Sequence, residues 1–136
     1  MIQIIAGKKG SGKTKRLIDL TNATAKEATH SIIFVDDDNS YMYDIDHSVR
    51  FVNAADFYVE NADMFLGFLG GMLASNFDIG TIFVDAFKKI AKADLADCGT
   101  IIKAMEELGS KHDVNFVLSV SEDPAALPDF MKPYVN

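Results

Sequence analysis

The feature that most constrains this chain is a glycine-rich segment close to its N-terminus. The segment consists of Gly7, Lys8, Lys9, Gly10, Ser11, Gly12, Lys13 and Thr14, and it matches the pattern G-x-x-x-x-G-K-[ST] in full. A β-rich run over residues 2–6 precedes it, and a helical pattern over about residues 12–28 follows it. A glycine turn between a strand and a helix points backbone N–H groups and the positive helix end at one place. The segment therefore predicts a site for a phosphorylated ligand.

Two side chains of this segment narrow the ligand to a nucleoside triphosphate. Lys13 is expected to reach the β- and γ-phosphates, and the Thr14 hydroxyl is expected to ligate Mg²⁺. The alternative is a glycine-rich turn followed by a fortuitous Lys-Thr pair, and the flanking strand and helix argue against it. We expect ATP and Mg²⁺ as the ligands, since the chain has no N-K-x-D motif of the kind that reads guanine.

The rest of the chain alternates apolar runs with helical patterns. Strands are expected over 31–35, 81–84 and 114–118, with 49–52 as a candidate for a further short strand. A helix is expected from Asn53 to about Ser75, with Asp56 as its capping partner. Another is expected over about 94–108, closed by Gly109. Apolar strands between helices predict one domain, 1–136, with a three-layer α/β/α P-loop fold and a mainly parallel sheet of four to five strands.

The composition excludes several classes of partner. Asp and Glu number 20 against 13 Lys and Arg, which gives a net charge of −7 and argues against duplex nucleic acid. The only cysteine, Cys98, cannot form an intramolecular disulfide, and its helical spacing from neighbouring apolar residues predicts burial. No signal-peptide pattern occurs, and the most apolar stretch, 64–74, is too short to span a bilayer. We therefore expect a cytoplasmic protein without membrane association.

A single carboxylate follows the third strand. Asp85 ends the apolar run 81–84 and is expected to hold Mg²⁺, through a water molecule. The alternative is that Asp85 only caps the following turn. Many ATPases carry Glu directly after this Asp, whereas this chain has Ala86, so the usual position of the general base is empty.

Other polar residues at strand ends are candidates for the general base and for further contacts to the phosphates or the metal. The best substitute is the group Asp36 to Asp38, which could supply a base, with Asp37 as the choice, or a second metal contact; a solvated acidic turn is an equal alternative. Ser119 or Ser121 could place a hydroxyl near the γ-phosphate. The only arginines are Arg16 and Arg50, and Lys88 and Lys89 are expected to be solvated surface rather than substitutes for an arginine.

In these segments the chain resembles the P-loop NTPase superfamily. Residues 7–14 resemble Walker A, and residues 81–85 resemble Walker B. The order of elements resembles the RecA-like, additional-strand division, which implies that the strand 114–118 inserts between the two Walker strands. It also implies that the strand 31–35 lies at an edge, next to the strand that ends at Asp85. More narrowly, the chain resembles small stand-alone bacterial ATP-binding proteins sometimes labelled twitching-motility or pilus-retraction ATPases, through the Walker A loop.

Three functions follow from these observations, in order of preference. The first is an ATPase or ATP-dependent switch that holds Mg·ATP through Lys13, Thr14 and Asp85. The second is a small-metabolite kinase, whose acceptor pocket would be built by Tyr41, Tyr43, Asp44 and His47. The third is a non-catalytic nucleotide-binding subunit that acts through a protein partner or a homo-oligomer. The glycines of the apolar helix expected over residues 53–75, Gly67, Gly70 and Gly71, motivate this last function, although internal packing is the preferred explanation for them.

Overall fold

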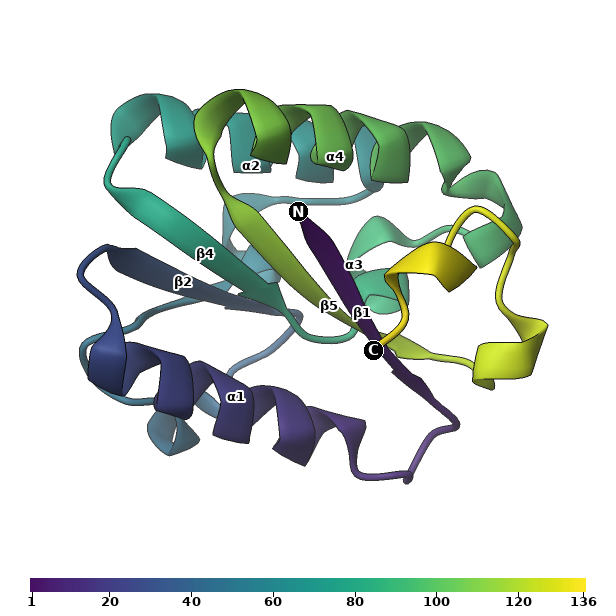
Figure 1. Cartoon of the computed structure of the whole chain (residues 1–136), viewed down its shortest axis with the longest axis horizontal. Coiled ribbons are helices and arrows are strands. Elements are labelled where there is room, and N and C mark those ends of the chain that lie inside the picture. The colour runs from purple at the N-terminus through teal and green to yellow at the C-terminus, as the bar shows by residue number, and fades with distance from the viewer.

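The computed structural model describes residues 1–136 and contains one sheet of five parallel strands (Figure 1). The strands are β1 (Ile2–Gly7), β2 (Ser31–Asp36), β3 (Arg50–Asn53), β4 (Ile79–Val84) and β5 (Asn115–Ser121). Their order across the sheet is β1-β5-β4-β2-β3. The expected α/β class and the number of strands are confirmed.

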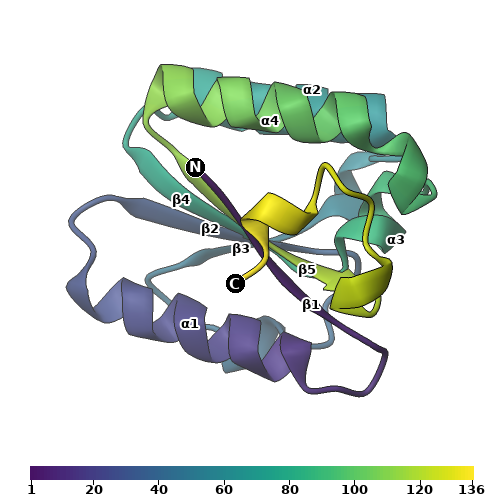
Figure 2. The same ribbon diagram turned by 45° about the vertical axis from the view of Figure 1, so that its right-hand side comes forward.

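Helices cover both faces of this sheet, as Figures 1 and 2 show. On one face lies α1 (Lys13–Glu27) alone, and on the other lie α2 (Ala62–Ser75) and α4 (Gly99–His112), with the short α3 (Phe87–Ala91) beside them. The arrangement is the expected three-layer α/β/α architecture. None of the helices combines the length and the apolar character that crossing a membrane requires.

The two faces bury cores of different size. Successive residues of a strand point to opposite faces. Ile33 and Val35 of β2 accordingly join the core of 27 buried residues under α2 and α4, whereas Ile32 and Phe34 join a core of nine under α1. Both faces of the strands are buried, which explains why the strand sequences are almost continuously apolar. Cys98 lies in the larger core, as expected.

The strand order brings together chain segments that are far apart in the sequence. β5 lies between β1 and β4, and β2 is the other neighbour of β4, in agreement with the resemblance. The strand 31–35 was expected at the edge, and this prediction is wrong: residues 50–53 form β3, which pairs with β2 from Ile33↔Arg50 to Asp36↔Asn53 and is itself the edge. At the opposite edge the Asn136 N–H donates to the Ile4 carbonyl at 3.0 Å.

The helix expected from Asn53 to Ser75 is interrupted. A 3₁₀ turn over Ala54–Phe57 ends at Tyr58, whose left-handed backbone (φ 61°) breaks the helical path, and α2 begins only at Ala62. Asp56 is not the capping partner: the Asn53 side chain itself accepts a hydrogen bond from the Ala55 N–H at 3.0 Å.

The end of α4 also differs from the expectation. Leu95–Asp97 forms a separate 3₁₀ turn, and α4 continues past Gly109 to His112, where Asp113 (φ 56°) ends it. Gly109 lies within the helix and is buried. A Cβ at this position would lie only 2.7 Å from the Val114 carbonyl oxygen. Close packing against the following strand, and not helix termination, therefore explains this glycine.

Candidate functional site

The glycine-rich segment forms the turn between β1 and α1. Gly10 (φ 85°) and Gly12 (φ 84°) have left-handed backbones, which glycine adopts without the steric cost that a Cβ imposes. A Cβ on Gly7 would collide with the Ser11 side chain. The first backbone hydrogen bond of α1 runs from the Arg16 N–H to the Gly12 carbonyl at 3.1 Å. The N–H groups of residues 13–15 therefore have no backbone partner at the positive end of the helix.

This turn borders an open cavity of about 870 Å³ at the carboxyl ends of the strands. The volume lies within the range of roughly 300–1,000 Å³ typical of small-molecule sites. The predicted site residues that line it are Lys9, Gly10, Gly12, Lys13, Thr14, Asp37, Asp85 and Ser119. Gly7, Lys8 and Ser11 do not line it, and the exposed Lys8 ammonium lies 3.9 Å from Asp123 instead. The strand order thus assembles most of the predicted residues around one space.

The predicted metal-binding pair is in contact. The Thr14 hydroxyl lies 3.3 Å from both carboxylate oxygens of Asp85, which is 4 % exposed. Ser119, from the inserted strand β5, donates to Asp85 Oδ1 at 2.5 Å and accepts from the Ala86 N–H at 2.8 Å. The Thr14 hydroxyl and the Asp85 carboxylate are oxygen ligands of the kind that fits Mg²⁺, with water and phosphate oxygens completing its coordination. The free N–H groups nearby are donors for phosphate oxygens.

Ser119 is therefore placed differently from a free sensor of the γ-phosphate. Both hydrogen bonds of its hydroxyl go to the segment that carries Asp85, so this serine orients the carboxylate. Sequence reasoning did not find this contact, although the expected insertion of β5 next to β4 was the signal that could have indicated it. Ser121, two residues on, lines the cavity and is exposed.

Lys13 is the buried cation of the site. It is 8 % exposed and takes part in none of the five ion pairs of the structure. A cation on a side chain that is mostly withdrawn from water is stabilised by an anion close to it. The position of Lys13 in the cavity therefore favours an anionic ligand.

A second buried carboxyl group lies beside Asp85. Asp36 follows the Val35↔Val84 register pair, so at the end of β2 it lies beside Asp85, the residue that follows β4. It is 2 % exposed; its Oδ1 accepts from the Asp37 N–H at 2.7 Å, and its Oδ2 has no hydrogen-bond partner. Burial, followed by the neighbouring Asp37 side chain and the charge of Asp85, raises the pKa of Asp36 to about 8. Asp37, the base expected from the sequence, is only half-buried.

The cationic residues considered for the site are distributed unevenly. Arg16 and Arg50 are exposed and do not line the cavity. Lys88 and Lys89 lie on α3 with exposed side chains, as expected, but Lys89 also lines the cavity. No arginine of this chain therefore reaches the space in front of Thr14 and Asp85.

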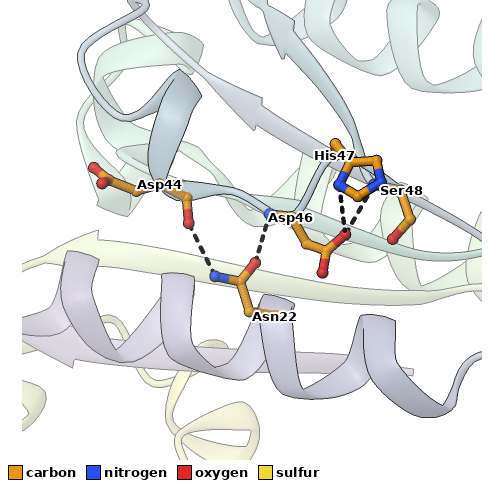
Figure 3. Close-up of polar contacts among 5 residues, drawn as sticks. All are labelled: Asn22, Asp44, Asp46, His47 and Ser48. Atoms are coloured by element: carbon orange, nitrogen blue, oxygen red, sulfur yellow. Dashed lines mark hydrogen bonds and ion pairs between the residues drawn. The ribbon is translucent and has the colours of Figure 1, made fainter.

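The four residues expected to form an acceptor pocket are divided between two cavities, of which the second is lined by Tyr43, Asp44 and His47. Tyr41 and Asp44 line the first cavity, whereas Tyr43 and His47 do not. The segment that carries them is held on α1 by Asn22 (Figure 3), whose side chain donates to the Asp44 carbonyl at 2.9 Å and accepts from the Asp46 N–H at 2.8 Å. The fully exposed His47 side chain lies 3.8 Å from Asp46.

Comparisons with protein-family models and with curated proteins find no match to this chain.

Proposed function

We propose that this protein binds ATP together with Mg²⁺ and hydrolyses it slowly, or faster when a partner stimulates it. The observation that carries the proposal is the largely buried Lys13 side chain, whose ammonium lacks a carboxylate partner and which lines the same cavity as the Thr14–Asp85 pair. A triphosphate supplies the negative charge that this arrangement lacks, and the free N–H groups of residues 13–15 are donors for its oxygens.

Each residue of the site has a distinct task in this proposal. Lys13 neutralises charge on the β- and γ-phosphates. Thr14 and Asp85 hold Mg²⁺, which supplies further positive charge to the phosphate oxygens when it is bound. Ser119 fixes the Asp85 carboxylate through the 2.5 Å hydrogen bond and thereby keeps it directed towards Thr14.

Two features support slow intrinsic turnover. Ala86 has no side-chain group that accepts a proton, and no arginine lines the cavity. Asp36 is a poor base at neutral pH, because its raised pKa of about 8 keeps it protonated. Asp37 lines the cavity and is half-buried, and it is the carboxylate that we propose for general-base work.

A non-catalytic subunit is the second candidate, and the glycines of α2 favour it. A Cβ at Gly67, Gly70 or Gly71 would meet no other atom within 4 Å. Internal packing, the explanation preferred from the sequence, is therefore wrong for these three positions. Open glycines on a helix allow the backbone of a partner helix to approach closely, which supports contact with a partner protein or a second copy.

The proposal is tested by calorimetric titration of the protein with Mg·ATP, followed by measurement of phosphate release. Lys13→Ala is expected to weaken binding by roughly tenfold to hundredfold, the value of a hydrogen bond to a charged group. Lys26→Ala removes an equal charge from the exposed far end of α1 and is the matched control. No binding to the wild type, or equal affinities for the two variants, would contradict the proposal. Binding without phosphate release would favour the non-catalytic subunit.

A further inference from the structure

The acidic segment after β2 has the spacing of a cation site. One carboxylate oxygen from each of Asp36, Asp37 and Asp38 lies within 4.8 Å of the others. Two ligand oxygens on opposite sides of a cation are about 4 Å apart for Mg²⁺ and about 5 Å apart for Ca²⁺, given metal–oxygen distances of roughly 2.1 and 2.4 Å. Three carboxylates at this spacing fit around one divalent cation.

Proximity of carboxylates alone is common on protein surfaces, but Asp36 adds an independent observation. Its side chain is 2 % exposed, it lines the cavity, and its Oδ2 is buried without any hydrogen-bond donor. A buried oxygen without a partner is destabilising, because burial removes the water that would otherwise donate to it. None of the five ion pairs involves the three aspartates, and the charge of Lys89, which contributes to lowering the pKa of Asp38, acts without a close ion pair.

We propose that Asp36, Asp37 and Asp38 form a second divalent-cation site, distinct from the Thr14–Asp85 pair and facing the same cavity. Asp36 offers its Oδ2, because its Oδ1 already accepts from the Asp37 N–H. Asp38 likewise offers its second oxygen, because its Oδ1 accepts from the Ser40 N–H at 2.8 Å. A set of oxygen donors only selects Mg²⁺, Mn²⁺ or Ca²⁺, with water completing the coordination shell.

The position of this cation gives it a role beside the nucleotide, and this part rests on the proposed function. The cavity that holds the three aspartates also contains Lys13 and Thr14. A second cation there adds positive charge to a cavity that no arginine lines. The affinity for a triphosphate therefore increases when the site is filled. Binding of the cation itself does not require nucleotide.

The experiment is a titration of the nucleotide-free protein with Mn²⁺, in which free Mn²⁺ is counted by electron paramagnetic resonance. The test variant is D37N/D38N, because both side chains lie outside the core and the amides keep the acceptor oxygens. We expect one bound Mn²⁺ in the wild type and at least a tenfold weaker affinity in this variant. Thr14→Ala and the exposed Asp56→Asn are expected to retain wild-type affinity, and Ca²⁺ is expected to compete with Mn²⁺.

Two results would overturn the second site. Unchanged Mn²⁺ affinity in D37N/D38N would mean that the segment is a solvated acidic turn, and equal loss in Thr14→Ala would mean that the protein has a single site. A Mg·ATP titration of the same samples separates this inference from the proposed function. Bound Mn²⁺ without ATP binding rejects the ATP-binding function alone, whereas ATP binding without the Mn²⁺ site rejects the second cation alone.

Discussion

Ser119→Ala should be among the most destabilising single substitutions at the site. The side chain is fully buried, and its hydroxyl joins two groups of the β4–α3 turn, the Asp85 carboxylate and the Ala86 N–H. Alanine leaves the Ala86 N–H without a partner, which costs about 1–3 kcal/mol, and removes a bond to a charged group worth about 1.5–3 kcal/mol. Because the two losses overlap, we expect the free energy of unfolding to fall by about 3 kcal/mol.

Urea unfolding followed by circular dichroism measures this loss. With a denaturant dependence of roughly 2 kcal/mol per molar urea, the midpoint is expected about 1.5 M below that of the wild type. Ser121→Ala is the matched control, because Ser121 lies two residues further along β5, is exposed and makes no side-chain hydrogen bond. A loss below about 1 kcal/mol in Ser119→Ala, or equal losses in both variants, would refute the structural role of Ser119.

Four further substitutions test other parts of the structure. Gly12→Ala is expected to lower the free energy of unfolding by about 1–2 kcal/mol, because a Cβ is disfavoured at φ 84°, and unchanged urea stability would contradict this. Gly67→Ala and Gly71→Ala are each expected to raise it by up to about 1 kcal/mol, since helix propensity improves and the Cβ meets nothing; destabilisation would reveal a missed contact. The raised pKa of Asp36 means that the folded state retains a proton that the unfolded state loses above about pH 4. In EDTA, wild-type stability relative to Asp36→Asn should therefore fall by up to about 1.4 kcal/mol per pH unit between pH 5 and 8, and parallel pH profiles would refute the shift.

The sequence was sufficient for the fold class because the strands are buried on both faces and therefore read as apolar runs. The helix ends that were predicted wrongly depend on tertiary contacts. Gly109 was expected to end a helix, but its role is to allow the Val114 carbonyl to pack closely, and Asp113 adopts the left-handed backbone instead. Tyr58 likewise breaks the helical pattern with a left-handed backbone that its residue type does not favour.

At the candidate site, the local sequence pattern was sufficient to predict the glycine-rich turn and Asp85, but not the contacts that surround them. The turn at residues 7–14 and the carboxylate of Asp85 are recognisable because each requires particular residue types at fixed spacing. The burial of Asp36 and the orientation of Asp85 by Ser119 depend on the order of the strands. The position of His47 outside the cavity depends on how residues 42–48 pack against α1. Nothing in the acidic triplet itself indicates that its first member, and not Asp37, is the buried one.

The most direct test of nucleotide binding is a ¹⁵N–¹H correlation spectrum recorded during titration with Mg·ATP, for which a chain of 136 residues is well suited. We expect the largest shift changes at the N–H groups of residues 8–15, with smaller ones at Asp36 and Asp85, and their loss in Lys13→Ala. No shift changes at millimolar Mg·ATP, or changes confined to residues 42–51, would contradict the binding of a triphosphate at this turn.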